Sequence, residues 1–408
     1  MPVCLCACVP VCLCACVPVC LCACVPVCLC ACVPVCLLAC LPGTAAQPRR
    51  NIQKHSREAI AACVNALGFL LAGGLAALLA LYLAPILITA ANRYGIVDRP
   101  KPPLKTQAEP VAYLGGLVVF AAFLLSLALT FPFDQRVLAI LLCATLIVAV
   151  GLVDDLGTLI PRDKLIGQVL AAVVLVKGGV KVDIAAVPFP LDEALSVLWM
   201  VTCMNAFNIV DVSDGLAVTA ALVGSMGATA IAVLNHEPMI AAMSSSLFGA
   251  CLGFLRVNRQ PARMYLGDTG SMFLGAMLGA LAMIGNYSDA NVVSAWFVPL
   301  CLLAIPLFDL ALVIVARLKA GRRIYQGSSD HFAVRLRHHG KAARFSARVA
   351  GAAGAAVVAA GVGSMLLDDR LASVVFGLTA AALIALLLFV LLGLPPKTTA
   401  TTTAGDPL

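Results

Sequence analysis

Long apolar runs constrain this chain more than any other feature of its sequence. From about residue 59 onward, they alternate with short polar connectors. A run of about 20 apolar residues is long enough to cross a bilayer as a helix. Because 62% of the 408 residues are hydrophobic and only 12% are charged, too little polar surface remains for a water-soluble fold. The sequence therefore predicts an all-α polytopic membrane protein.

About 11 transmembrane helices can be placed in one integral-membrane domain, predicted over residues 51–396. A disordered tail is predicted over 397–408. The boundaries of such spans are less certain than their existence. The predicted spans cover residues 64–91, 111–131, 137–153, 165–181, 194–209, 216–234, 239–255, 271–286, 292–316, 347–366 and 371–394.

The first 50 residues are predicted to be a separate, disordered segment. They repeat Val-Pro-Val-Cys-Leu-Cys-Ala-Cys with a period of eight and hold 14 of the 19 cysteines. The word GTGCCTGT, written three times, can encode this repeat, so we interpret it as a translated DNA repeat or an over-extended start. Its Cys-x-Cys spacing is a poor match to a metal site, and a lipoprotein-type signal would need a basic start. The five other cysteines lie in apolar runs and are interpreted as helix-packing residues.

The distribution of positive charge predicts the orientation of the domain. One set of alternate connectors carries 19 Lys and Arg, whereas the opposite set carries four. The positive-inside rule makes the first set cytoplasmic. This orientation would place four basic residues before the first span outside, namely Arg49, Arg50, Lys54 and Arg57. We keep it because the excess of 19 over four is larger. Since topology accounts for the net charge of +7, no nucleic-acid partner is predicted.

Three acidic segments end apolar runs on the predicted cytoplasmic face. They are Asp154-Asp155, Asn205–Ala217 and Gly267–Ser271. Carboxylates at a membrane edge are costly and indicate function. Several carboxylates with lysines and arginines nearby suit a diphosphate bound through Mg²⁺, which prefers oxygen ligands. The sequence thus predicts an active site on the cytoplasmic face.

These segments, in this order, resemble the polyprenyl-phosphate N-acetylhexosamine-1-phosphate transferase family. The motifs are Asp154-Asp155, then Asn205-x-x-Asn208-x-x-Asp211-x-x-Asp214-Gly-Leu-Ala, then Gly267-Asp-Thr-Gly-Ser271. The first cytoplasmic loop agrees, with Val97-Asp98-Arg-Pro100 and Leu104-Lys105. The resemblance covers about residues 64–394. It is greatest to the UDP-GlcNAc:undecaprenyl-phosphate GlcNAc-1-phosphate transferase branch.

The resemblance implies a reaction in the bacterial cytoplasmic membrane. A polyprenyl phosphate, such as undecaprenyl phosphate, attacks the β-phosphate of a UDP-amino sugar. UMP leaves, and the lipid-linked sugar starts a cell-envelope glycan such as lipopolysaccharide. The implied cofactor is Mg²⁺, for which Mn²⁺ can substitute. Members of the family can also form homodimers.

The resemblance also implies roles for individual residues. Asp268 would be the principal Mg²⁺ ligand, and Asp154 and Asp155 would lie beside the metal and the lipid phosphate. Lys105 would bind phosphate, and Tyr265 would stack on uracil. The remaining implied substrate-binding residues are Asn205, Asn208, Asp211, Asp214, His331 and Arg335. In the last loop, Val334 stands where the family commonly has a further histidine.

Other interpretations remain open at this point. Asp154-Asp155 could be a solvated helix end, Lys105 a topological charge, and Tyr265 an interfacial aromatic. Asp309 lies within a predicted span and is expected to pair with an arginine or with backbone. A secondary transporter would place its acids near the bilayer midplane within a broken-helix repeat. A catalytically silent homologue would retain the motifs without the reaction.

Overall fold

The computed structural model describes residues 49–98, 110–157, 159–182, 188–285, 292–323 and 330–393, with side chains from Leu67 onward. Lys105, the predicted tail and nearly all of the cysteine-rich segment lie outside these residues. The chain divides into two units, Met1–Gly68 and Phe69–Leu408. In the first unit, the described residues form the beginning of a helix that starts at Arg49. The second unit is the helix bundle to which all that follows refers.

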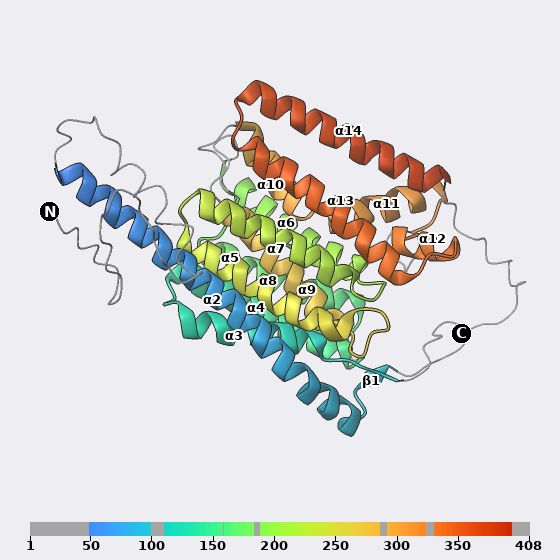
Figure 1. The fold of residues 1–408 in the computed structure, drawn as a ribbon. Helices are drawn as coiled ribbons and strands as arrows, with labels where there is room; N and C mark the ends of the chain where they lie inside the picture. The colour runs from blue at the N-terminus through green and yellow to red at the C-terminus, as the bar shows by residue number, and fades with distance from the viewer. Residues whose placement is uncertain are drawn as a thin grey trace, which may run out of the picture. The chain divides into compact units, whose positions relative to one another are not determined.

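Helices account for most of the described chain, which confirms the predicted all-α class (Figure 1). Two short strands, β1 (Val97–Asp98) and β2 (Val111–Ala112), pair antiparallel with Asp98 opposite Val111. The helices are α2 (Arg49–Tyr94), α3 (Gly115–Thr130), α4 (Gln135–Asp155), α5 (Pro161–Lys177), α6 (Leu191–Val210), α7 (Leu216–Leu234), α8 (Pro238–Asn258), α9 (Gly267–Ile284), α10 (Val292–Leu302), α11 (Ala304–Lys319), α12 (Phe332–His338), α13 (Ala343–Ser364) and α14 (Asp369–Gly393).

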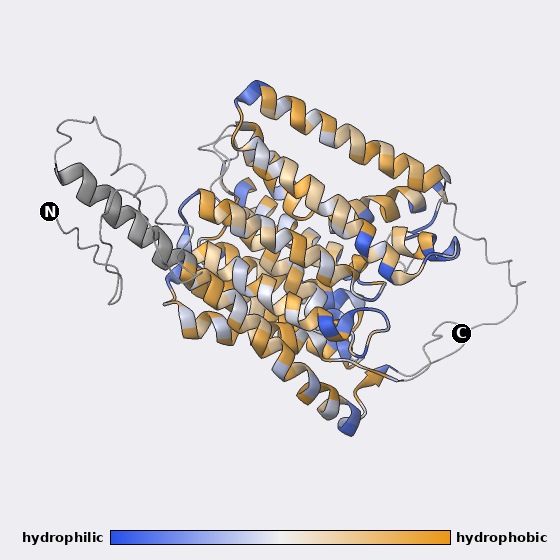
Figure 2. Cartoon of the chain, in the orientation of Figure 1, coloured by the Kyte–Doolittle hydropathy of each residue, from blue (hydrophilic) through white to orange (hydrophobic). Residues whose placement is uncertain are grey.

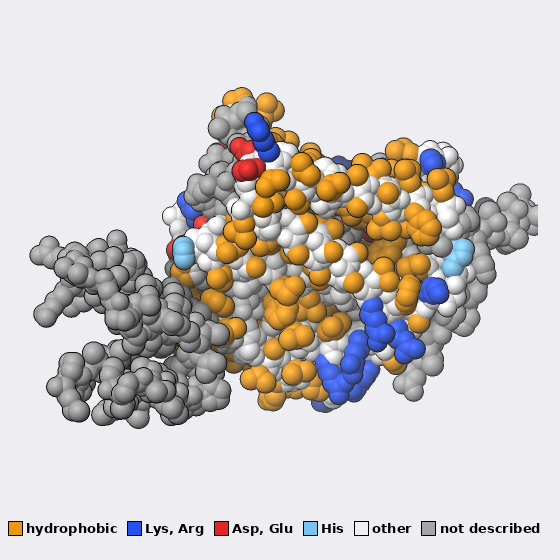
Figure 3. All heavy atoms as spheres, turned by 45° about the horizontal axis from the view of Figure 1, so that its top comes forward, with side chains coloured by type: hydrophobic (Ala, Val, Ile, Leu, Met, Phe, Trp, Pro, Cys, Tyr) orange, Lys and Arg blue, Asp and Glu red, His pale blue; other side chains and the backbone are white. Residues whose placement is uncertain are grey.

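The described helices confirm a polytopic membrane protein. Among these residues, eight helices are long and apolar enough to cross a membrane, or nine if α10 and α11 form one span. Helices α3 and α5 have only 16 and 17 residues, so the total of 11 stays a prediction. Apolar residues run along the helices in Figure 2, and Figure 3 shows them spread over the visible surface. Such a surface suits contact with lipid.

The predicted span 292–316 is wrong as a single straight helix. Helices α10 and α11 meet at Leu303 with a bend of 81°. Pro306 lies in the first turn of α11, where it has no N–H for the carbonyl four residues earlier and its ring crowds that turn. The proline therefore explains a break that the hydropathy of the run does not reveal.

Helix α9 lies in the middle of the bundle, and 78% of its 18 residues are buried. It packs against α3, α4 and α6. A Cβ atom added at Gly116 or Gly151 would overlap the backbone of the first turn of α9. Small residues at such crossings let two backbones approach closely. These two glycines therefore let α3 and α4 approach the first turn of α9 closely.

The cysteines within the bundle have a packing role. Cys143, Cys203, Cys251 and Cys301 are all buried and unbridged. This confirms the interpretation of these four as small apolar residues of helix interfaces. The side chain of Cys63 lies outside the described set.

Candidate active site

A polar cavity of about 590 Å³ opens at one end of the helix bundle. It is lined where α4, α6 and α8 end and where α9 begins, with α12 and the β1–β2 pair at its edge. The three predicted acidic segments therefore do meet at one end of the bundle. Whether that end is cytoplasmic stays a prediction. Six aspartates line the cavity: Asp98, Asp154, Asp155, Asp211, Asp214 and Asp268.

Lys164 lies at the centre of the acidic cluster. Its ammonium nitrogen is 2.8 Å from Asp154 Oδ2 and 2.7 Å from Asp268 Oδ2. It also donates to Asn208 Oδ1 at 3.3 Å. Three oxygens from α4, α9 and α6 thus converge on one cation from α5. An ammonium group has three protons to donate, so these contacts account for all of them.

The two adjacent aspartates of α4 have different surroundings. Asp154 contacts the ammonium of Lys164, whereas Asp155 accepts from the first turn of α9. Its Oδ1 accepts the Asp268 N–H at 2.7 Å, and its Oδ2 accepts the Thr269 N–H at 3.1 Å and the Thr269 hydroxyl at 2.6 Å. A carboxylate is favoured at a helix N-terminus, where the amides lack partners within the helix. Asp155 therefore positions the backbone that carries Asp268.

The two predicted asparagines of α6 also differ. Asn208 donates to Ser271 Oγ at 3.1 Å and faces the cavity. Asn205, one turn earlier, donates to Gln168 Oε1 at 2.8 Å and to the Val201 carbonyl at 2.8 Å. Gln168 is 1% exposed, whereas Asn205 is partly exposed. Asn205 thus ties α6 to α5 behind the cavity wall.

The loop between α6 and α7 brings Asp211 and Asp214 to the cavity. Asp214 Oδ2 accepts the Ala262 N–H at 3.1 Å, which holds the loop that follows α8. Asn258 at the end of α8 accepts the Gly215 N–H at 3.1 Å and donates to the Met264 carbonyl at 2.9 Å. These three hydrogen bonds connect the segments that precede α7 and α9.

The charge of the cavity shifts the titration of the groups in its loops. Burial, together with the carboxylates of Asp268, Asp155 and Asp214, raises the pKa of Asp211 to about 8. Burial, together with the carboxylates of Asp98, Asp155 and Asp268, raises the pKa of Tyr113 to about 12. Each shift disfavours a further negative charge. The lining of the cavity therefore has a strongly negative electrostatic potential.

Aromatic rings form another part of the cavity wall. Tyr113 and Tyr265 meet edge to face with ring centroids 6.1 Å apart. The Tyr265 N–H donates to the Ala112 carbonyl at 2.9 Å, which places it beside β2. Tyr265 lines the cavity, and its stacking on uracil stays a prediction. Arg337 of α12 also lines the cavity and donates to the Val212 carbonyl at 3.2 Å.

The last-loop residues His331 and Arg335 are buried rather than part of the cavity lining. His331 Nδ1 lies 2.8 Å from Asp309 Oδ2, and Asp309 Oδ1 accepts the Phe332 N–H at 2.9 Å. Asp309 therefore pairs with a backbone amide, which confirms one of its two expected kinds of partner, and also with a histidine that was not expected. Arg335 donates through Nε to the Asp330 carbonyl at 2.9 Å. Through Nη1 it also donates to the Val390 carbonyl of α14 at 3.4 Å.

Sequence reasoning missed two cationic residues of the site. In the sequence, Lys164 was used only as one of the positive charges that predict orientation in the membrane. It nevertheless follows Asp154 and Asp155 closely and lies in the first turn of the next helix. Arg337 gave no signal, because its position depends on how α12 packs. The other sequence-predicted residues of the acidic segments line the cavity, with the exception of Asn205.

Fold and site together define a polytopic membrane protein with an acidic cavity at the ends of its helices. Comparison with known proteins then identifies the family of the chain. The profile of glycosyl transferase family 4 matches residues 137–286, the stretch from α4 to α9 that carries most of the cavity. The chain belongs to this family.

Relatives are found in several bacteria. The protein named "Probable undecaprenyl-phosphate N-acetylglucosaminyl 1-phosphate transferase" of Bacillus subtilis is 31% identical over 278 residues, which cover 66% of this chain and 77% of the relative. The "Decaprenyl-phosphate N-acetylglucosaminephosphotransferase" of Mycobacterium tuberculosis is 33% identical over 285 residues, 60% of this chain and 70% of the relative. A "Phospho-N-acetylmuramoyl-pentapeptide-transferase" of Chlamydia trachomatis is 42% identical over only 97 residues, 23% of this chain and 29% of the relative.

Proposed function

We propose that this protein transfers an N-acetylhexosamine 1-phosphate from a UDP-sugar to a polyprenyl phosphate and releases UMP. The names of the relatives from Bacillus subtilis and Mycobacterium tuberculosis support a polyprenyl phosphate as the acceptor. They also support N-acetylglucosamine as the sugar. The proposed location is the bacterial cytoplasmic membrane, with the cavity on the cytoplasmic side. The product would start a lipid-linked glycan of the cell envelope.

One observation carries the proposal toward a divalent cation. Six aspartates line the cavity, yet both proposed substrates are anions. A diphosphate could not approach this surface without a cation to neutralise it. Lys164 and Arg337 supply too little positive charge for that purpose. The cavity therefore suits Mg²⁺, with Mn²⁺ as a substitute.

The residues present fit such an ion. The ammonium of Lys164 marks a place where oxygens of Asp154, Asp268 and Asn208 already converge on a cation. In the described chain, no group of three or more His, Cys, Asp or Glu side chains is arranged to hold a metal alone. This agrees with Mg²⁺, which usually takes one or two carboxylates and completes its shell with water and substrate phosphates. Asp268 and Asp154 would hold it.

Different residues of the chain would then position the metal ligand and bind the nucleobase. Asp155 fixes the first turn of α9 and so aims the Asp268 carboxylate into the cavity. Tyr113 and Tyr265 offer an aromatic edge for the nucleobase. When bound, Mg²⁺ supplies neutralisation of charge on the leaving phosphate. An oxygen of the polyprenyl phosphate attacks the β-phosphorus, the bond from that phosphorus to the UMP oxygen breaks, and UMP departs with the electron pair.

Label transfer tests the proposal directly. Membranes containing the full chain would receive Mg²⁺, undecaprenyl phosphate and UDP-GlcNAc labelled in the sugar, with EDTA-treated membranes in parallel. We expect label in the lipid phase, equimolar UMP and no transfer with EDTA. Transfer from a different UDP-amino sugar would keep the reaction and change the donor. Well-folded protein that transfers from no donor would identify a catalytically silent homologue and refute the proposal.

A further inference from the structure

Lys164 occupies the position in the acidic cluster that a metal ion would need. Its side chain is only 16% exposed, and its nitrogen lies 2.7 Å from Asp268 Oδ2 and 2.8 Å from Asp154 Oδ2. Asn208 Oδ1 completes the set at 3.3 Å. A divalent cation bound by the same carboxylates would lie next to this ammonium. The positive charges of the metal ion and of the ammonium would then repel each other strongly, because the site is partly buried.

The rest of α5 is held in place independently of Lys164. Gln168, one turn further along, exchanges hydrogen bonds with Asn205 and donates to Met272 Sδ at 3.2 Å. The helix is therefore anchored to α6 and α9 behind the cavity. A lysine has a flexible four-carbon stem and a compact charge. Its ammonium can consequently leave the carboxylates while the helix stays in position.

We propose that Lys164 is the resident counter-ion of this site and that a divalent cation displaces it. In the metal-free protein the ammonium holds Asp154 and Asp268 together and keeps their charges compensated. Metal binding releases the ammonium into the cavity, where it binds a phosphate oxygen of the incoming substrate. The role of the metal in this inference rests on the proposed function, whereas the competition between lysine and metal can be measured without it.

The inference predicts opposite effects from two substitutions. Lys164→Met removes the competing cation and leaves two uncompensated carboxylates, so the affinity for a divalent cation should rise about tenfold or more. Lys164→Arg keeps the charge on a planar group that can bind carboxylates through two parallel hydrogen bonds. Arginine should therefore compete better, and the affinity should fall severalfold. A scaffold role for Lys164 would instead weaken binding in both variants.

Mn²⁺ titration followed by electron paramagnetic resonance measures this competition. The full-length protein, purified in detergent without donor or lipid, would be compared with both variants. Lys177→Met is the matched control, because Lys177 ends the same helix, is 64% exposed and pairs with Glu193 at the other end of the bundle. It should bind Mn²⁺ as the wild type does. Thermal unfolding would establish that each variant is folded.

The outcomes separate the two proposals. Tighter Mn²⁺ binding by Lys164→Met and weaker binding by Lys164→Arg would support displacement. If the methionine variant does not fold, Lys164→Gln, which also removes the charge, takes its place with the same expected rise in affinity. Equal or weaker binding by a folded Lys164→Met, tighter binding by Lys164→Arg, or no Mn²⁺ binding by any form would overturn the inference. Failure of label transfer alone would refute the proposed reaction and leave the lysine–metal competition standing.

Discussion

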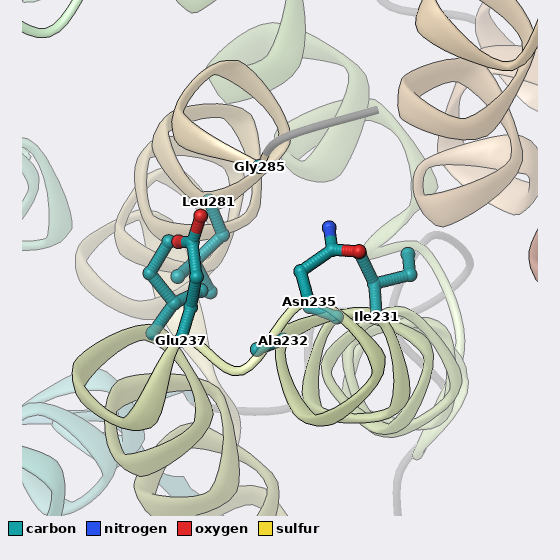
Figure 4. A pocket seen from close by; sticks show the side chains of 8 residues that line it. Ile231, Ala232, Asn235, Glu237, Leu281 and Gly285 are labelled. Atoms are coloured by element: carbon teal, nitrogen blue, oxygen red, sulfur yellow. The ribbon is translucent and has the colours of Figure 1, made fainter. Parts of the chain in front are cut away.

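The two ends of the helix bundle handle charge in different ways. The end where α9 begins has a cavity lined by six aspartates, and polar residues gather there in Figure 2. At the other end, where α7 and α9 finish, a small cavity is lined mainly by apolar residues, with Asn235 and Glu237 as its polar members (Figure 4). Two ion pairs lie where α5 ends and α6 begins, Lys177 with Glu193 and Lys181 with Asp192.

This difference shows what distinguishes a candidate active site from ordinary charge at a membrane edge. Charges that are paired one to one compensate each other, so they leave little net electrostatic potential to attract a charged ligand. An excess of carboxylates around one buried ammonium is costly in the free protein and is relieved by a bound cation. The variants below test this contrast, beginning with the largest expected effect.

Asp268→Asn should reduce transfer at least about a thousandfold, because a metal's charge stabilisation of several kcal/mol corresponds to such a factor. The labelled-sugar assay measures this loss. Glu237→Gln, at the small cavity of the other end, is the matched control and should retain full transfer. Equal losses in the two variants would contradict the assignment of catalysis to one end.

Gly151→Ala should disturb the same end by sterics alone. The new methyl group would overlap the backbone of Thr269 in the first turn of α9. Overpacking of this kind costs about 1–3 kcal/mol, and it would separate Asp155 from the amides it caps. We expect a lower melting temperature together with reduced transfer.

Gly74→Ala provides the control for that substitution. Nothing lies within 4 Å of a Cβ added at Gly74, on the exposed side of α2. An alanine there should leave transfer unchanged and stabilise the helix by up to about 1 kcal/mol. If Gly151→Ala were equally harmless, the close approach of α4 and α9 would be refuted.

Asp211→Asn should alter how stability depends on pH. The pKa of Asp211 is raised from 3.8 to about 8, so the folded state keeps a proton that the unfolded chain loses at lower pH. Wild-type stability is therefore penalised progressively as pH rises from about 4 to 8. Because asparagine removes this penalty, the variant's advantage in melting temperature should grow between pH 5 and pH 8, measured without divalent metal. An advantage independent of pH would argue against the raised pKa.

Glu193→Gln should have the smallest effect. It breaks an ion pair whose lysine side chain is 64% exposed, and exposed pairs contribute about 0–1 kcal/mol. We expect unchanged transfer and a change in melting temperature close to the error of measurement. A large loss of transfer would show that the two ends are coupled, and the contrast between them would need revision.

The sequence by itself determined the class of protein, the approximate positions of its helices and the three acidic segments. Hydropathy and length are local properties of one run, so each described helix from α3 to α9 lies over a predicted span. Because successive spans alternate in direction, the segments had to share one end. The bend at Leu303 was missed, since hydropathy takes no account of the missing amide at Pro306.

Only the tertiary structure decided which partners the polar groups take. Lys164 reaches Asp268 across 104 residues of sequence, and Asp155 accepts the N–H of Asp268, 113 residues later, in the first turn of α9. Likewise, Asp309 of α11 contacts His331 of the last loop, 22 residues later. Such contacts depend on which helix faces pack together, and a pattern within one run carries no information about its neighbour in space. Tertiary packing therefore turned an acidic motif into a cluster with one lysine at its centre.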